Sequence, residues 1–244
     1  RRADTAGGGG GDPPRRRSVM APPPPTTLSR EHTRIGVIGD IHTSVEKLQW
    51  ALALLKRQAV EHIFATGDIV DGPRPAEDVM RACALLQENG VLSVLGNHDR
   101  WLLDEQQREL TDATFPDELT GETRAYLQTL PASVELNTSQ GWLLLGHGLG
   151  SNDMSALYPH DHGPSLQHNT TLQAILQHQR YRFVVSGHTH LRMVRKLEGV
   201  TFINAGALHY TREPCCVVLD FAEQRAQFYD HIEQGFVLGP GHAL

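Results

Sequence analysis

Five short motifs along the chain place Asp, Asn or His side chains where a β-strand is expected to end. They are Asp40-Ile41-His42, Gly67-Asp68-Ile69-Val70-Asp71, Gly96-Asn97-His98-Asp99, Gly146-His147-Gly148 and Gly187-His188-Thr189-His190. Seven of these side chains can bind metal through nitrogen or oxygen, which is more than one metal ion needs from a protein. The economical interpretation is a two-metal hydrolytic centre, in which paired cations generate a nucleophile from water and hold a phosphoryl group.

Each motif taken alone also has a purely structural explanation. A Gly-Asp pair after a strand is common in turns, because glycine tolerates the backbone conformation and aspartate caps the next turn or helix. A lone histidine such as His98 is more often a core or surface residue than a ligand. Five such motifs in one chain, all at strand ends, favour the metal centre over coincidence.

The strands and helices expected after Arg34 explain how the first three motifs come together. Strands are expected at 35–38, 63–66 and 91–95, each followed directly by a motif. Thr43 and Glu46 predict a capping box for the first helix, and Pro75 suits the start of the second. This is a βαβαβ unit with a parallel sheet, and ligands bind beyond the carboxyl ends of strands in such sheets.

The second half of the chain has a different pattern. Residues 101–129 predict two helices, 134–136 and 142–145 two strands, and 172–179 a helix that leads into a strand at 183–186. Short strands at about 191–197, 200–204, 215–220 and 225–231 predict an antiparallel meander on the far side of the molecule. The expected fold is therefore α/β, a two-sheet β-sandwich flanked by helices.

Residues 1–33 are expected to form a disordered N-terminal tail, and residues 34–244 a single domain. The tail contains a glycine run at 7–11, three arginines at 15–17 and a proline run at 22–25. With so few apolar residues, such a segment cannot offset the entropy of ordering itself.

The overall composition limits the partners and the cellular location that we expect. A net charge of −6 argues against a general nucleic-acid groove, which favours a basic surface. No apolar run is long enough to span a membrane. The three cysteines imply no disulfide framework, which favours a cytoplasmic location, and the adjacent Cys215 and Cys216 should point to opposite faces of a strand.

The order and type of these motifs resemble the calcineurin-like metallophosphoesterase superfamily, in its small single-domain branch. The family signature is Asp-x-His, Gly-Asp-x-x-Asp, Gly-Asn-His-Asp/Glu, a lone His and Gly-His-x-His, and all five blocks stand between residues 40 and 190. The segment Ile203-Asn204-Ala205-Gly206-Ala207 resembles the Asn-Pro-Gly-Ser turn of that branch, with Ala in place of both Pro and Ser.

The resemblance implies two divalent metal ions and assigns their ligands. The first metal would be held by Asp40, His42 and His190, the second by Asn97, His147 and His188, and Asp68 would bridge them. A bridging carboxylate lowers the repulsion between cations about 3.5–4 Å apart. Mixed imidazole and carboxylate ligands suit Mn²⁺, Fe or Zn²⁺ better than Mg²⁺.

The resemblance also implies two catalytic residues beside the metals. A metal-bound hydroxide would attack phosphorus, and His98 would donate a proton to the leaving oxygen or steady the charge on phosphate. Asp71 would hold the imidazole of His98 and favour its protonated form. Some small family members, including bacterial phosphodiesterases and the related retromer subunit, carry Cys in place of this histidine. Because this chain keeps His98, a competent enzyme is favoured.

The expected function is hydrolysis of a small-molecule phosphate ester or diester, with an open cleft favouring phosphodiesterase activity. The alternatives are a nuclease of the same superfamily and a non-catalytic metal-binding scaffold. The sequence specifies no oligomeric state. Arg74, Arg100 and the loop at 158–162 could reach substrate or could be surface features. Seven further histidines are expected to be structural or surface residues: His32, His62, His168, His178, His209, His231 and His242.

Overall fold

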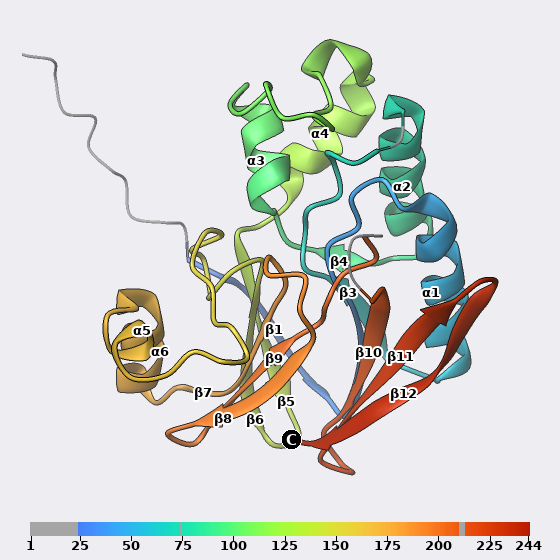
Figure 1. The fold of residues 1–244 in the computed structure, drawn as a ribbon. Helices are drawn as coiled ribbons and strands as arrows, with labels where there is room; N and C mark the ends of the chain where they lie inside the picture. Colours follow the sequence, from blue (N-terminus) through green and yellow to red (C-terminus); the bar gives the residue numbers. More distant parts are fainter. Residues whose placement is uncertain (1–23, 74, 210–212) are drawn as a thin grey trace, which may run out of the picture.

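The computed structural model describes residues 24–73, 75–209 and 213–244. Two six-stranded sheets face each other, and helices cover their outer faces (Figure 1). We call the sheet that contains β2 sheet I and the sheet that contains β7 sheet II. The α/β sandwich expected from the sequence is therefore confirmed.

Sheet I carries the βαβαβ unit. Its strands are, in spatial order, β12 (Gly235–Ala243), β11 (Arg225–Ile232), β10 (Cys215–Asp220), β2 (Arg34–Ile38), β3 (His62–Ala65) and β4 (Leu92–Ser93). The strands β2, β3 and β4 are parallel, and β10, β11 and β12 extend the sheet in antiparallel fashion from β2. Helices α1 (Val45–Arg57) and α2 (Ala76–Glu88) connect the parallel strands, so their carboxyl ends meet at one edge.

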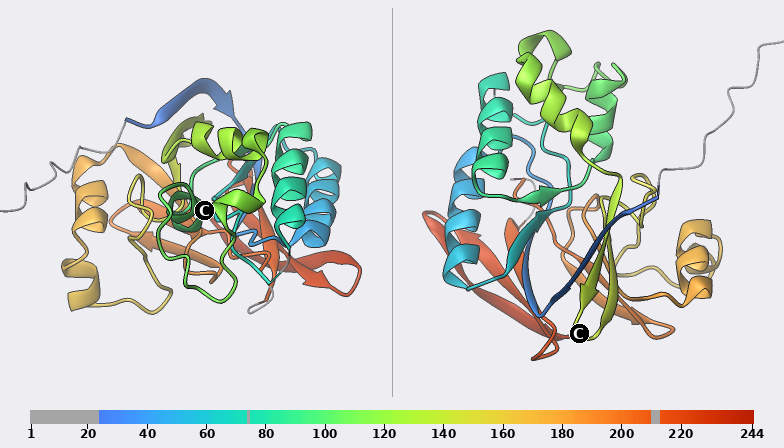
Figure 2. Two further views of the ribbon diagram at one scale, coloured as in Figure 1. Left: turned by 90° about the horizontal axis from the view of Figure 1, so that it is seen from above. Right: turned by 180° about the vertical axis from the view of Figure 1, so that it is seen from behind.

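Sheet II combines parallel and antiparallel pairs. Its spatial order is β1 (Thr26–His32), β5 (Ser133–Thr138), β6 (Gly141–Gly146), β7 (Tyr181–Ser186), β9 (Val200–Asn204) and β8 (Met193–Leu197). The strands β6, β7 and β9 are parallel neighbours. Helices α5 (Pro164–Gln167) and α6 (Thr170–His178) lie beside this sheet, on the side away from sheet I (Figure 2).

Three apolar clusters hold these layers together. One fills the space between the sheets, one joins sheet I to α1 and α2, and the third joins sheet II to α6. Alternation along β10 shows the arrangement, because Cys215 belongs to the cluster between the sheets and Cys216 to the cluster under the helices. The two cysteines thus point to opposite faces, as expected, and both are free thiols.

The expected meander is split between the two sheets. The hairpin β8–β9 joins sheet II through a parallel pairing of β9 with β7, whereas β10, β11 and β12 join sheet I. Among the described residues between β9 and β10, Ala207 pairs with Asp40. Strand periodicity identified these strands but contains no information on which sheet each one enters.

The expected disordered tail is too long. Residues 26–32 form β1, which pairs in parallel with β5 at the edge of sheet II. The strand is polar because most of it is exposed, so the apolar pattern that identifies buried strands is missing. Residues 1–23 lie outside the described part of the chain.

Two helix starts also differ from expectation. Helix α1 begins at Val45 with Ser44 as its N-cap residue, and no side chain caps it. The capping box of Thr43 and Glu46 is absent because the Thr43 N–H donates to the Ile69 carbonyl (3.1 Å), which holds Thr43 in a left-handed turn. Helix α3 (Asn97–Leu103) begins inside the third motif, before the expected start at residue 101.

The rest of the region expected to hold two helices contains α4 (Gly121–Thr129) and the short 3₁₀ turn η1 (Pro116–Glu118). Segment 104–115 connects α3 to η1 without a helix or strand. Within the described residues, none of the helices combines the length and apolar character needed to cross a bilayer.

Candidate metal centre

The five motifs meet at one edge of the sandwich, where strands from both sheets end. Asp40 follows β2 and Asp68 follows β3, while Asn97 lies in the first turn of α3. From sheet II, His147 follows β6 and His188 follows β7. The structure thus brings all seven predicted ligands together from the two sheets, although they are spread from residue 40 to residue 190 of the sequence.

The turns that carry these residues have an uncommon backbone. His42, Asp68, Asp71, His188 and His190 all have φ between 42° and 64°. Side chains other than glycine rarely occupy this left-handed region, and such residues cluster at functional sites. Five of them within one site indicate that pointing these side chains into the site is worth the conformational free energy that each left-handed residue costs.

Two motif glycines are required by close packing around the carboxylates. A Cβ at Gly96 would lie 2.2 Å from Asp68 Oδ1, and one at Gly187 would lie 2.7 Å from Asp40 Oδ1. Any side chain at either position would therefore displace a predicted ligand. This explains why glycine directly precedes the ligands Asn97 and His188.

The ligands assigned to the first metal lie close to one another. His42 Nε2 is 3.2 Å from His190 Nε2 and 3.6 Å from Asp68 Oδ2. Asp40 Oδ2 is 3.8 Å from His190 Nε2, and this buried oxygen has no hydrogen-bond partner within the described residues. An unpartnered buried carboxylate oxygen beside two imidazole nitrogens fits a position for a cation.

The ligands assigned to the second metal form a matching group. Asn97 Oδ1 lies 2.8 Å from His147 Nε2 and 2.8 Å from His188 Nδ1. His147 Nε2 is also 3.2 Å from Asp68 Oδ2, the same oxygen that faces His42. Asp68 is therefore the residue common to both groups, as a bridging ligand requires.

Carbonyl contacts on the outer nitrogens determine which way the imidazole lone pairs face. His42 Nδ1 is 2.6 Å from the Asp71 carbonyl oxygen, and His147 Nδ1 is 2.7 Å from the Thr66 carbonyl oxygen. Because a carbonyl only accepts, the proton of each ring belongs on Nδ1. Each Nε2 then presents a lone pair to other acceptors, an arrangement that a bound cation stabilises.

The pKa values describe a site that favours positive charge between its carboxylates. Burial disfavours the charged form of His147, but Asp68 and Asp40 outweigh it and raise its pKa to about 10, so Nε2 also binds a proton, which a bound cation would replace. Burial raises the pKa of Asp40 to about 7. Burial and the neighbouring His42 lower the pKa of His190 to about 3, which keeps this imidazole neutral and available as a ligand.

Donor chemistry and spacing therefore fit two divalent cations. Among the described residues, two trios of Asp and His side chains place one potential ligand atom each within 4.8 Å of one another, and Asp68 belongs to both. These trios are His42-Asp68-His98 and Asp40-Asp68-His147, so one includes the predicted acid His98 and the other places Asp40 of the first group with His147 of the second.

His98 lies beside the predicted ligands and contacts Asp71. Its Nδ1 is 2.9 Å from Asp71 Oδ2, and its side chain is 23% exposed. Burial lowers the pKa of His98, but the hydrogen bond to Asp71 and the charge of Asp68 outweigh it, so the net pKa is raised. With Nδ1 engaged by Asp71, the imidazole can therefore carry its second proton on Nε2.

Three residues of the site were not predicted from the sequence. Asp99 is fully buried and accepts hydrogen bonds from the backbone of Ile69, Val70 and Gly96, which ties the second motif to the third. The ring centroid of His209, expected to be structural or exposed, lies 5.0 Å from that of His42. Arg108 forms an ion pair with Asp71.

These three residues differ in whether the sequence could have identified them as part of the site. Asp99 is part of the third motif and could have been recognised there, whereas nothing in the local pattern distinguishes His209 or Arg108 from surface residues. Arg100 forms an ion pair with Asp153 (2.6 Å) rather than facing solvent alone. Arg74 lies outside the described residues. In the 158–162 loop, the carbonyls of Tyr158 and Asp161 accept hydrogen bonds from Arg195.

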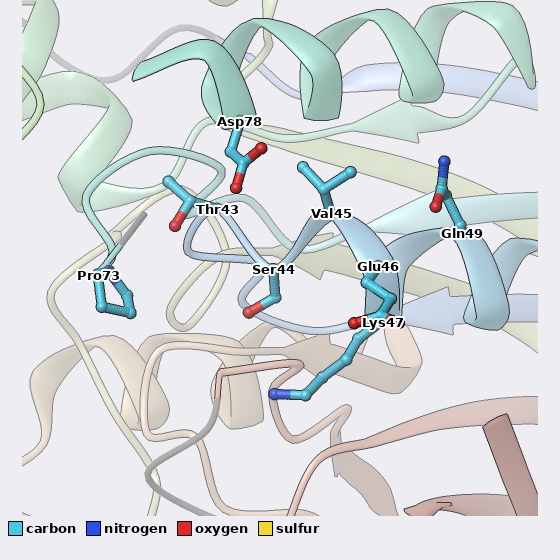
Figure 3. A pocket seen from close by; sticks show the side chains of 8 residues that line it. All are labelled: Thr43, Ser44, Val45, Glu46, Lys47, Gln49, Pro73 and Asp78. Atoms are coloured by element: carbon cyan, nitrogen blue, oxygen red, sulfur yellow. The ribbon is translucent and has the colours of Figure 1, made fainter. Parts of the chain in front are cut away.

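A cavity of about 530 Å³ lies at the N-terminal ends of α1 and α2, and its lining includes none of the seven predicted ligands. Figure 3 shows the Asp78 carboxylate, from the first turn of α2, pointing toward Thr43 and α1. Of the lining residues, Thr43 is the neighbour of the predicted ligand His42 in the sequence. It is lined by Thr43, Ser44, Val45, Glu46, Lys47, Gln49, Pro73 and Asp78.

Comparisons with known proteins agree with this architecture. Residues 33–224 match the calcineurin-like phosphoesterase superfamily domain. An uncharacterized protein of Methanocaldococcus jannaschii is 26% identical over 185 residues, which cover 72% of this chain and 70% of that protein.

Two crystal structures are similar in fold. A protein of Pyrococcus horikoshii has a TM-score of 0.66 at 16% identity, covering 86% of this chain and 89% of that one. A metallophosphoesterase from Sphaerobacter thermophilus has a TM-score of 0.61 at 20% identity, covering 83% and 89%. With the motifs in order, the fold in place and the family match over most of its length, this chain belongs to the calcineurin-like phosphoesterase superfamily.

Proposed function

We propose that this protein is a dinuclear metal-dependent phosphoesterase that hydrolyses a small-molecule phosphate ester or diester. The observation that carries the proposal is the position of Asp68 Oδ2, 3.6 Å from His42 Nε2 and 3.2 Å from His147 Nε2, between two groups of buried ligands. Asp40, His42 and His190 would hold one cation, Asn97, His147 and His188 the other, and Asp68 both.

When bound, the two cations would supply a nucleophile from water and withdraw charge from the phosphoryl oxygens. The protein residues have two further tasks. Asp68 and Asp40 balance the positive charge, and the backbone N–H of His98 donates to Asp68 Oδ1 (2.9 Å) to fix that carboxylate. The outer carbonyl contacts of His42 and His147 keep their lone pairs directed inward.

His98 is the proposed general acid. Its Nδ1 is engaged with Asp71, which leaves Nε2 for the leaving oxygen, and its raised pKa favours the protonated form needed to donate. A family member with its full ligand set but no such acid could still bind metal, so His98 favours an enzyme over a metal-binding scaffold.

A small-molecule substrate is supported by the size of the cavity at the N-terminal ends of α1 and α2, which includes Thr43, the sequence neighbour of His42. A cavity of about 530 Å³ falls within the ordinary range for small ligands, roughly 300–1,000 Å³. Two carboxylates, Glu46 and Asp78, and one ammonium, Lys47, line it, and the chain carries a net charge of −6. Negative charge here disfavours a long polyanion, so we place a nuclease second.

The test is hydrolysis of p-nitrophenyl phosphate and bis-p-nitrophenyl phosphate with added Mn²⁺, each against the same protein stripped of metal. We expect metal-dependent turnover, with the diester faster than the monoester. Faster monoester turnover would redirect the assignment to a phosphatase. Two bound metal ions without turnover of either compound would contradict the proposed enzyme and favour the scaffold.

A further inference from the structure

Arg108 lies in segment 104–115 and reaches back to the candidate site with a side chain that is only 12% exposed. Its guanidinium forms a bidentate pair with the Asp71 carboxylate, in which Nη1 donates to Oδ1 at 3.0 Å and Nη2 donates to Oδ2 at 2.8 Å. The same Oδ2 is 2.9 Å from His98 Nδ1. Arg108, Asp71 and His98 therefore form a continuous chain of contacts that ends at the proposed acid.

The remaining donors of Arg108 also face the protein. Nε donates to the Gln106 carbonyl (2.7 Å), and Nη1 donates a second time to the Thr114 carbonyl (2.6 Å). Arginine has five N–H donors, and these contacts occupy four of them. A guanidinium committed in this way is directed at Asp71 and not at a substrate phosphate.

Thr114, from the same segment, holds Asp71 from a second direction. Its backbone N–H donates to Asp71 Oδ1 (2.8 Å), and its hydroxyl accepts from the Asp71 backbone N–H (3.2 Å). Asp71 itself sits at a φ of 55°, an uncommon conformation that needs support from its surroundings. Segment 104–115 thus fixes both the backbone and the carboxylate of Asp71.

Bidentate contact decides the orientation of the carboxylate plane. A paired guanidinium sets the positions of both oxygens at once, whereas a single N–H leaves the carboxylate free to rotate. Because His98 Nδ1 and Arg108 Nη2 share Oδ2, rotation of Asp71 would move the imidazole. Lysine offers a point charge without the planar fork and cannot reproduce this geometry.

We propose that Arg108 is a positioning residue for the hydrolytic reaction, which holds Asp71 so that its Oδ2 directs the His98 imidazole toward the leaving group. The inference rests on the proposed function of the site and assigns a role to segment 104–115, which carries none of the five motifs. Arg108 touches neither substrate nor metal ligands in this role and acts only through Asp71.

The test is a double-mutant cycle of Arg108→Ala with His98→Ala, assayed on bis-p-nitrophenyl phosphate with Mn²⁺. We expect Arg108→Ala alone to lower kcat by about 10- to 100-fold, because misplacing a reacting group costs up to about 10²-fold. KM and metal content should stay near wild type, and Arg108→Lys should recover only part of the loss. In the His98→Ala background, Arg108→Ala should change kcat by less than about twofold.

An equal loss of kcat in both backgrounds would show a merely structural role and overturn the inference, as would full activity of Arg108→Ala. The matched control is Arg81→Ala, which removes an exposed ion pair with Glu88 on α2 and should leave kcat unchanged. If Arg108→Ala does not fold, the same cycle is run with Arg108→Lys.

A second readout separates this inference from the proposed function. The His98 Nδ1–H can be followed by ¹⁵N-resolved NMR without any turnover. We expect a protected Nδ1–H signal in the wild type and in Arg81→Ala, and its loss in Arg108→Ala. An inactive wild type would refute the proposed function, whereas an unchanged His98 signal in Arg108→Ala would refute the role of Arg108 whatever the activity.

Discussion

The predicted ligands differ in whether they face one group of ligands or both. Asp40 and His190 serve one group of ligands and Asn97 and His188 the other, whereas Asp68 Oδ2 faces an imidazole nitrogen from each. The lone pairs of these groups face one another, and a bound cation would offset their repulsion. Asp68 is the proposed bridging ligand because a single oxygen of its carboxylate faces both groups, whereas Asp40 contacts His147 of the second group through its other oxygen, Oδ1, at 3.4 Å.

Asp68→Ala should abolish metal binding at both positions, because the carboxylate lies between the two ligand groups. The measurement is metal content by mass spectrometry after dialysis against Mn²⁺, with Asp117→Ala as an exposed control. We expect two ions per chain in the wild type and in the control. Two ions in Asp68→Ala would show that the carboxylate does not bridge.

His98→Ala should keep both metal ions and lose rate by about 10²- to 10⁴-fold, the usual contribution of acid–base catalysis. The measurement is kcat on bis-p-nitrophenyl phosphate, with His178→Ala on the exposed side of α6 as the matched control. A fully active His98→Ala would mean that another group, or none, protonates the leaving oxygen.

At the scale of elements, edge strand β1 is attached to sheet II through a buried carboxylate. Glu135 on β5 is 4% exposed and accepts hydrogen bonds from Thr27 on β1, from Arg180 (2.6 Å) and from the hydroxyl of Tyr181 on β7. One side chain thus links β1, β5 and β7. Of the polar residues of β1, Thr27 bonds to Glu135, whereas His32 contacts Asn137 and His62.

Glu135→Ala should lower the free energy of unfolding by about 1–3 kcal/mol, because it removes the buried carboxylate that is the shared acceptor of three hydrogen bonds. Urea unfolding followed by circular dichroism measures the change. Glu31→Ala on exposed β1 is the control and should stay within about 0.5 kcal/mol of wild type. Equal effects of the two substitutions would show that Glu135 does not anchor the strand.

The sequence predicted elements well where an apolar pattern marks them. The parallel strands β2 and β3 and the helices α1 and α2 lie within a few residues of their expected positions, since buried faces repeat with a fixed period. Edge strand β1 was not predicted because it is polar and exposed and therefore lacks an apolar pattern. The division of the meander between two sheets depends on long-range pairing, which periodicity does not encode.

The candidate site was likewise predictable where a local motif marks its residues and not where a contact joins distant segments. The ligand residues stand at strand ends in recognisable motifs, so their proximity could be predicted from the sequence. Arg108 reaches Asp71 across 37 residues from a segment without regular structure. Nothing in its local sequence separates it from an exposed arginine, and its role becomes visible only when the contacts are known.

For the whole molecule, the predicted metal ligands come from both sheets. Asp40, Asp68 and Asn97 follow strands of sheet I, whereas His147 and His188 follow strands of sheet II. The apolar cluster between the sheets holds the rest of the interface, but the edge at the metal centre is polar. Cations bound there would therefore stabilise the contact between the two halves of the sandwich.

Metal binding should consequently raise thermal stability. At a concentration about 100 times its Kd, a ligand that binds only the folded state contributes about 2.7 kcal/mol per site. Differential scanning calorimetry with and without Mn²⁺ should show a rise in Tm for the wild type and none for Asp68→Ala. An equal rise in both proteins would locate the stabilising metal outside this centre.

The proposed function depends above all on the position of Asp68 between two metal ions. An anomalous-difference map from crystals of the wild-type protein grown with Mn²⁺ would locate those ions. We expect two peaks on either side of the Asp68 carboxylate, one beside His42 and His190 and the other beside His147 and His188. A single peak, or peaks away from Asp68, would refute the two-metal centre and the function built on it.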